Sequence, residues 1–510
     1  MPQFKSIIEE EVEEPSLKRG LSLYSLFSIG YADVGADVYI ALGVTAMFAA
    51  GGTPLAFLIG SILYICIGLA YAELASTYPY AGGASVYAMM ATNDLIGFLA
   101  GWLVMLDYVI DIALFSVAAA GYLGFVFPWL LKSSLPTPLG VSLSMIGIAA
   151  IAIIAGLVIV NYIGIKPSAA LTVILVTGNL AILSMVLGLG YTTTWNFEKF
   201  VTNLAEIGGD FISEEVGYTG LLSVRFENFL YGLTLAMSSF IGIESIAQAA
   251  EEAEKPYKNL SKAAGISVIM VVVSVLSCSI LGLGVLGWRG LAEAQFNPVA
   301  AIVERVPIIG SHAAMLVAIV AFAMTVASTN TGVIGVSRLV FSMGKFLLLP
   351  RWFYKVHPKF RTPTRSILMF SAIAIVVVLW GALQPNILVF ISSLYNFGAL
   401  LSYILVLLAL IILRNDDRKT KRLYKAPGTI IVRRNGKIIE LPILGIIGLI
   451  GIGSVWLLVV IYHTTARIMG FTWILIGLII YSIYRRRINL SITSKFGREM
   501  LGIKENNNSN

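Results

Sequence analysis

The segment Ile29-Gly30-Tyr31-Ala32-Asp33-Val34-Gly35-Ala36-Asp37-Val38 lies inside the first long apolar run of the chain. Its glycines lower the free-energy cost of leaving helical geometry, and an aspartate within an apolar span is costly unless something pairs with it. A second interruption, Ser238-Ser239-Phe240-Ile241-Gly242-Ile243-Glu244, lies in the sixth apolar run. The sequence therefore predicts that the first and sixth helices are broken. Interrupted segments at corresponding positions of two halves are typical of the substrate site of transporters.

The composition places both interruptions in a membrane protein. Of the 510 residues, 58% are hydrophobic and 12% are charged, against about 25% charged in a typical soluble domain. A crossing helix needs about 20 apolar residues, so soluble enzymes and nucleic-acid-binding proteins are excluded. The apolar runs predict an all-α polytopic protein with twelve helices, at 22–48, 54–76, 96–125, 141–160, 167–190, 225–249, 261–287, 308–343, 366–383, 386–412, 441–462 and 468–485.

The basic residues predict the orientation. With the N-terminus inside the cell, most of the 35 Lys and Arg residues fall in cytoplasmic segments, as the positive-inside rule requires. We therefore expect a multi-pass protein of the cytoplasmic membrane with both termini cytoplasmic. The expected segments are a cytoplasmic N-terminal segment (1–21), a first five-helix repeat (22–190), an extracytoplasmic loop (191–224), a second five-helix repeat (225–412), a cytoplasmic loop (413–440), helices 11 and 12 (441–487) and a cytoplasmic tail (488–510).

Sequence patterns of catalysis are missing from the chain. It contains no HExxH, GxSxG or Walker sequence, and Cys66 and Cys278 stand alone in apolar stretches. We expect no enzymatic activity, no catalytic residues, no cofactor and no metal site.

Several motifs resemble the amino acid–polyamine–organocation (APC) superfamily of transporters. They are Gly35-Ala36-Asp37-Val38-Tyr39 in the first helix, 79–87 (PYAGGASVY) after the second, 239–245 (SFIGIES) with Glu251-Glu252 and Asn259 in and after the sixth, and Ser337-Arg338, Met343-Gly344-Lys345, Leu349-Pro350 and His357-Pro358 after the eighth. The sixth-helix motif is most similar to the arginine–agmatine exchanger branch. The resemblance implies a LeuT-type 5+5 inverted repeat plus two helices, with alternating access around a central site. It also implies that free amides after the first break bind a substrate carboxylate, and that carbonyls of the sixth helix take the ammonium.

Two departures from this family leave the substrate open. Asp37 replaces the family's second glycine, and Ser238 stands where the exchanger branch has a gating tryptophan. Asp33-Val34-Gly35, with Tyr39 shortly after, is also similar to a motif of potassium-uptake permeases of the same fold.

Five acids fall within predicted spans, namely Asp33, Asp37, Asp107, Asp111 and Glu244. Each costs roughly 2.5–3.5 kcal/mol at a helix centre, so each needs water, a proton, backbone amides or a cationic ligand. The alternative is structural: Asp33 and Glu244 cap broken helix ends, and the other acids bond within the bundle.

The substrate site follows from these acids and the two breaks. It is predicted at Asp33, Gly35, Ala36, Asp37, Tyr108, Asp111, Ser239, Phe240, Gly242, Glu244 and Tyr395. The aromatic residues are candidates for stacking or hydrogen bonding to substrate, although an aromatic side chain in a membrane helix often only packs.

The resemblance also implies a coupling-ion site. Asn179 falls at the position of a fifth-helix lysine that serves as a cation site in many relatives, and a LeuT-type fold places Ser328 and Thr329 of the eighth helix opposite it. The oxygens of these three residues suit a sodium ion. The alternatives are that the hydroxyls bond back to carbonyls one turn earlier, and that the acids carry protons instead.

These observations predict a secondary active transporter of amino acids or related organic amines. The alternative is a proton-coupled potassium importer of the same fold; a membrane enzyme or nutrient sensor fits less well. The expected partners are a small-molecule substrate (an amino acid or organic cation), H+ or Na+ as coupling ion, and the lipid bilayer, but no nucleic acid.

Overall fold

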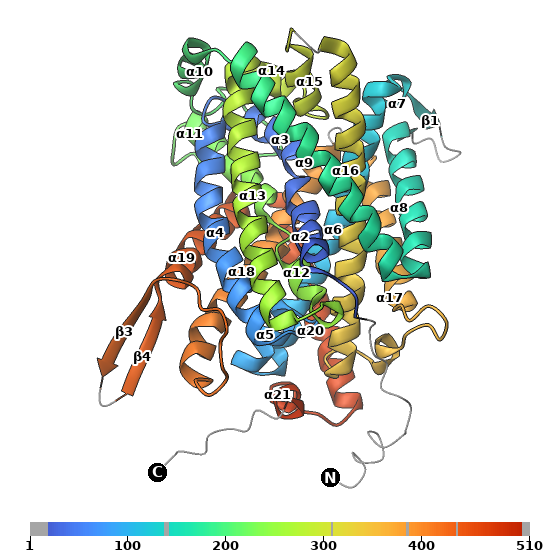
Figure 1. The fold of residues 1–510 in the computed structure, drawn as a ribbon, viewed down its shortest axis with the longest axis vertical. Coiled ribbons are helices and arrows are strands. Elements are labelled where there is room, and N and C mark those ends of the chain that lie inside the picture. Colours follow the sequence, from blue (N-terminus) through green and yellow to red (C-terminus); the bar gives the residue numbers. More distant parts are fainter. Residues whose placement is uncertain (1–18, 137–141, 308–309, 384–386, 435–436, 502–510) are drawn as a thin grey trace.

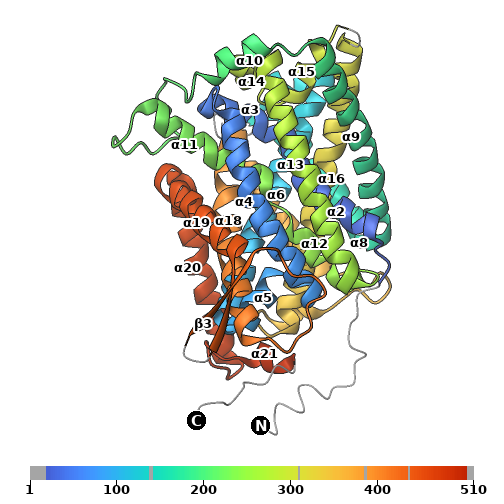
Figure 2. The ribbon, with the colours of Figure 1, turned by 60° about the vertical axis from the view of Figure 1, so that its left-hand side comes forward.

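The computed structural model describes residues 19–136, 142–307, 310–383, 387–434 and 437–501. These residues form a mostly helical bundle (Figures 1 and 2). Within them, twelve spans are long and apolar enough to cross a membrane, which confirms the predicted fold class. Parts of the predicted terminal segments (1–18 and 502–510) lie outside the described residues, as do positions 141, 308, 309 and 386 at the starts of three predicted spans.

The spanning helices match the predicted ranges within a few residues. They are α2 (Leu23–Gly35) with α3 (Val38–Ala49), α4 (Thr53–Thr77), α6 (Asp94–Val126), α8 (Met145–Ile163), α9 (Ile165–Thr193), α11 (Val224–Met237) with η1 (Ser238–Phe240) and α12 (Glu244–Gln248), α13 (Pro256–Val285), α16 (Gly310–Lys345), α17 (Thr364–Gly381), α18 (Ile387–Asp416), α19 (Ile443–Tyr462) and α20 (Thr464–Arg487).

Shorter elements join the spans. They are α5 (Ala84–Ala91), α7 (Trp129–Lys132), α10 (Phe197–Leu204), η2 (Ala250–Glu252), α14 (Gly287–Glu293), α15 (Pro298–Glu304), η3 (Arg351–Tyr354) and α21 (Phe496–Met500), with strands β1 (Ser134–Pro136), β2 (Ser142–Ser144), β3 (Thr429–Arg434) and β4 (Lys437–Pro442). The strands form two antiparallel hairpins, β1–β2 and β3–β4. The second hairpin lies mostly in the predicted cytoplasmic loop 413–440, and β4 extends two residues beyond it into the range predicted for the eleventh helix.

Local sequence explains where several helices begin. The side-chain oxygens of Ser22, Asn93 and Ser223 accept hydrogen bonds from backbone amides three residues later, which satisfies free donors of the first turn. Pro54 and Pro256 lie in the first turns of α4 and α13, where a missing N–H costs nothing.

Buried ion pairs gather at one end of the bundle. Three fully buried arginines each form an ion pair where α16, α18 and α20 end: Arg338 with Glu252 at 3.2 Å, Arg414 with Glu73 at 2.5 Å, and Arg485 with Asp94 at 2.5 Å. We name this end, where α5 and α21 lie in Figure 1, the α21 end. The opposite end carries α10, α14 and α15.

Candidate functional site

The first break is shorter than the sequence analysis predicted. Only Ala36 and Asp37 separate α2 from α3, and both keep right-handed helical backbone angles. The predicted unwinding from Gly30 onward is wrong, because the glycines serve close packing instead. A Cβ on Gly30 would lie 2.4 Å from Cδ1 of Ile246 in α12, and one on Gly35 would lie 2.9 Å from the Tyr31 ring.

The sixth-helix break is a true change of backbone direction. Ile241 is extended, with φ −101° and ψ 140°, and Gly242 has φ +123°. A side chain is strained at that φ value. A Cβ on Gly242 would also lie 2.8 Å from Cγ of Asp33, so Gly242 is the point where the two interrupted helices meet.

The five predicted acids are all buried, each with at most 1% of its surface exposed. One carboxyl oxygen of each lacks a hydrogen-bond partner within the described part of the chain: Asp33 Oδ2, Asp37 Oδ2, Asp107 Oδ1, Asp111 Oδ2 and Glu244 Oε1. Electrostatic interactions connect them: Asp33 with Glu244, Asp37 with Asp33 and Asp111, and Asp107 with Glu244. The structure therefore brings the five acids into one cluster around the breaks.

Hydroxyl groups donate to the second carboxyl oxygen of three of these acids. Thr331 donates to Asp33 Oδ1 at 3.0 Å, Tyr395 donates to Asp111 Oδ1 at 3.4 Å, and Tyr403 donates to Glu244 Oε2 at 2.6 Å. No described Lys, Arg or His lies within 4.0 Å of the five carboxyl groups. Burying an unpaired charge costs free energy, so these carboxyl groups need either bound protons or a cationic ligand.

The cluster is not a compact metal centre. Across the described ranges, no three His, Cys, Asp or Glu side chains form a group that could hold a metal ion. The acids instead come from α2, the α2–α3 junction, α6 and α12.

The remaining predicted substrate residues occupy different surroundings. The hydroxyls of Tyr108 and Ser239 are buried and lack a described partner, and the Tyr108 ring packs against Gly335 of α16. Phe240 instead packs against rings of α4, with centroid distances of 5.5 Å to Tyr64 and 6.4 Å to Phe57. Tyr108 and Ser239 therefore have free polar groups to offer a ligand, whereas Phe240 has a packing role.

The three predicted coupling-ion residues make separate contacts. Asn179 accepts a hydrogen bond from Tyr39 and donates one to Tyr31. Ser328 donates to the backbone oxygen of Asp33 at 3.2 Å, whereas Thr329 bonds back to Thr325 at 3.0 Å, the alternative considered above. No hydrogen bond between described residues joins the three, and the sodium site stays a prediction.

Two residues absent from the predicted site belong to this arrangement. Asp107 is one of the five acids in the predicted spans but is not part of the predicted substrate site. Its side chain nevertheless lies within hydrogen-bonding reach of Glu244. Tyr403 was missed entirely. Its signal in the sequence is its spacing, since it follows Tyr395 by eight residues and so lies near the same face of α18.

Comparison with known proteins agrees with this architecture. The sequence model of the amino acid permease family matches residues 21–496. A branched-chain amino acid permease, BcaP, of Bacillus subtilis is 26% identical over 93% of this chain and 94% of its own length. A methylthioribose transporter of the same organism is 25% identical over 95% of this chain and 97% of its own length.

A plant relative is also similar. Cationic amino acid transporter 9, chloroplastic, of Arabidopsis thaliana is 28% identical over 67% of this chain and 58% of its own length. With a family match across nearly the whole chain and twelve candidate spans among the described residues, the protein is a transporter rather than an enzyme, and it belongs to the amino acid permease family of the APC superfamily.

Proposed function

We propose that this permease carries cationic amino acids or related organic amines across the cytoplasmic membrane by alternating access. The observation that carries this proposal is the cluster of five buried carboxyl groups without a described cation. A positively charged substrate group entering the cluster would replace the missing partner, and charge-assisted hydrogen bonds to carboxylates are about twice as strong as neutral ones.

The binding residues in this proposal are the predicted ones except Gly35 and Phe240, which serve packing, together with Asp107 and Tyr403. Asp111 and Glu244 face the substrate's cationic group, while backbone carbonyl oxygens of Ser239–Gly242 bind its α-amine. The amide of Asp37 already donates to the carbonyl oxygen of Val34 at 3.2 Å, so the free amide that the resemblance implied for the substrate carboxylate is not formed at Asp37. Two similarities support a cationic substrate: the sixth-helix resemblance to arginine–agmatine exchangers and the relative named as a cationic amino acid transporter.

The proposal also includes orientation and repeat structure. We assign the α21 end to the cytoplasm, because the segments at that end carry most of the Lys and Arg residues and basic residues favour cytoplasmic loops. Residues 22–190 and 225–412 are then the two five-helix repeats that surround the central site.

Proton coupling through the acids is the proposed coupling mode, because the hydroxyls of Ser328 and Thr329 are already donated to carbonyl oxygens. Proteoliposomes with a pH gradient or a sodium gradient imposed separately test this mode. Accumulation driven by the pH gradient alone supports it, and accumulation driven by sodium alone overturns it in favour of the site at Asn179, Ser328 and Thr329.

A thermal-shift screen of the purified protein tests the substrate class. Arginine, lysine, agmatine, leucine, methylthioribose and potassium chloride are compared at matched ionic strength, since a true ligand stabilises in proportion to RT ln(1 + [L]/Kd). Concentration-dependent stabilisation by the cationic amines supports the proposal. Stabilisation by potassium alone would support the importer alternative, and stabilisation by leucine alone would remove the requirement for a cationic side chain.

A further inference from the structure

The β3–β4 hairpin projects from the side of the bundle near the α21 end (Figure 1). Strand β4 packs against α18 and α19, whereas the main neighbour of β3 is β4 itself. A lone two-stranded hairpin is only marginally stable in water. The outer strand therefore gains little from the protein and leaves its side chains available for another contact.

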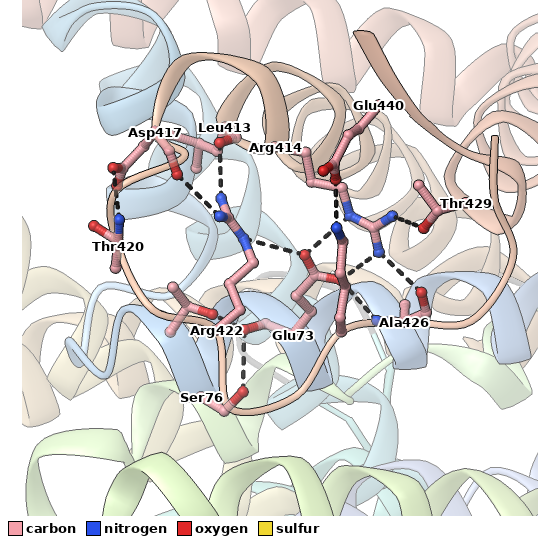
Figure 3. A network of polar contacts seen from close by, with 12 residues as sticks. Glu73, Ser76, Leu413, Arg414, Asp417, Thr420, Arg422, Ala426, Thr429 and Glu440 are labelled. Carbon is pink, nitrogen blue, oxygen red and sulfur yellow. Dashed lines mark hydrogen bonds and ion pairs between the residues drawn. The ribbon is translucent and has the colours of Figure 1, made fainter. Parts of the chain in front are cut away.

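A buried charge network fixes the base of this hairpin to the bundle (Figure 3). Glu73 near the end of α4 accepts hydrogen bonds from Arg414 at 3.0 Å and from the amide of Ala426 at 2.8 Å. Arg422 lies 3.4 Å from the same carboxylate. Arg414 also donates to Thr429, the first residue of β3. The hairpin is thus held at a defined position beside the spans.

One face of the hairpin is entirely apolar along its described middle. The register pairs Ile430 with Leu441 and Val432 with Ile439, and side chains of directly paired residues lie on the same face. Ile430 is 50% exposed and Val432 is 37% exposed. We call these four residues the apolar face. The opposite face is mixed, because it pairs Ile431, 61% exposed, with the acidic Glu440, and Ile438, 41% exposed, with the basic Arg433.

The segment around the hairpin is strongly basic. Residues 414–442 contain nine Lys or Arg residues and three Asp or Glu residues. Asp417 accepts a hydrogen bond from Tyr78, and Glu440 pairs with Lys425. The exposed side chains of Lys419, Lys421 and Arg433 form no ion pair with a described acid. The uncompensated charge around the apolar face is therefore positive.

We propose that the apolar face docks on the bilayer leaflet at the α21 end and that the surrounding basic residues select anionic lipid headgroups. The hairpin lies in the connection between α18, which ends at Asp416, and α19, which begins at Ile443 directly after β4, so it lies near the ends of two spans. An apolar surface bordered by Lys and Arg is the pattern of elements that lie in the membrane interface, and it complements the negative charge of anionic lipids.

The alternation of the strand supplies a matched pair of probes. Val432→Cys labels the apolar face and Ile431→Cys labels the opposite face one residue away. The native Cys66 and Cys278 are both buried, which limits background labelling. Each variant, coupled to a fluorophore, is placed in nanodiscs of phosphatidylcholine with or without phosphatidylglycerol, and quenching by a lipid-borne spin label is measured.

We expect strong lipid quenching at position 432, weak quenching at 431, and an increase at 432 when phosphatidylglycerol is added. Lys421→Glu should raise the amount of phosphatidylglycerol needed for half-maximal quenching about fivefold, the factor equivalent to ~1 kcal/mol per basic residue. Lys132→Glu, on the exposed segment beside β1 at the other end, is the matched control and should have no effect. Size-exclusion profiles confirm that each variant remains folded.

Three outcomes would overturn the proposal. Equal quenching at 431 and 432 would mean that the strand alternation does not orient the hairpin on lipid. If quenching at position 432 does not depend on phosphatidylglycerol, the basic residues do not select anionic lipids and only help set the orientation of the chain in the membrane. Protection of 432 from aqueous iodide without lipid quenching would mean that a protein surface, such as a second copy of this chain, covers the apolar face.

Discussion

Tyr403 and Glu244 are joined by a hydrogen bond of 2.6 Å between the tyrosine hydroxyl and Oε2 of the carboxyl group. The same hydroxyl accepts a hydrogen bond from the backbone amide of Gly242 at 3.0 Å. One side chain of α18 thus binds both the positive-φ residue of the sixth-helix break and the acid that begins α12. This arrangement connects the backbone of the break at Gly242 to the side chain of Glu244.

Tyr403→Phe removes both hydrogen bonds while keeping the ring. We expect transport, measured as kcat/KM for uptake into proteoliposomes, to fall by a factor corresponding to about 1–3 kcal/mol, because Gly242 and Glu244 each lose a buried partner. Tyr87→Phe is the control, since that hydroxyl has no described partner. Equal effects of the two substitutions would show that the Tyr403 contacts do not support transport.

Asp111→Asn and Glu244→Gln test charge selection by the cluster. Each should weaken binding of a cationic ligand such as arginine by about 1–3 kcal/mol, the contribution of a hydrogen bond to a charged group, and should weaken binding of leucine less. Isothermal titration of both ligands measures the difference. Equal losses for both would assign the two acids to structure or proton transfer rather than to recognition of the cation.

Gly242→Ala tests the contact between the two interrupted helices. Its Cβ would stand at φ +123° and 2.8 Å from Asp33 Cγ, and backbone strain of this kind costs about 1–3 kcal/mol. We expect uptake to be lost while the protein still inserts and purifies as a monodisperse sample. Gly265→Ala is the matched control, because its Cβ would meet no atom within 4 Å; impaired uptake in that variant would remove the specificity of the result.

His463, between α19 and α20, predicts a pH dependence of stability. Burial lowers the pKa of His463 from 6.5 to about 3, its ring stacks on Tyr231, and Nε2 bonds to Thr234. In the unfolded chain the histidine binds a proton below pH 6.5, so the stability contribution present at neutral pH is lost as the pH falls toward 3. Between pH 7 and pH 5 the loss should be about 2 kcal/mol.

Denaturant unfolding at several pH values, compared between the wild type and His463→Gln, measures this contribution. The variant should show a smaller loss of stability on acidification, because its amide binds no proton. Parallel pH profiles for the two proteins would contradict a buried neutral histidine. The comparison between variant and wild type isolates His463 from the acids of the central cluster, which are the same in both proteins.

The spans and the positions of both breaks were predictable from sequence because their causes are local. A bilayer of fixed thickness requires about 20 apolar residues in each crossing helix, and the segment 241–242, with its glycine, is visible as an interruption of such a run. The same local reasoning overestimated the first break, since a glycine that unwinds a helix and a glycine that admits a neighbour look alike in sequence. At Gly30 the neighbour is Ile246, more than two hundred residues away along the chain.

Only the tertiary structure decided which polar groups meet. Tyr403 and Glu244 are 159 residues apart, and Thr331 and Asp33 are 298 apart, so no periodicity within one helix relates either pair. The sequence by itself determined that acids lie within the spans and that each needs compensation, because the hydrocarbon core penalises every isolated charge. Packing of α2, α6, α12, α16 and α18 around the two breaks decided that these acids share one cluster, because helix packing depends on side-chain shape along the whole of each interface.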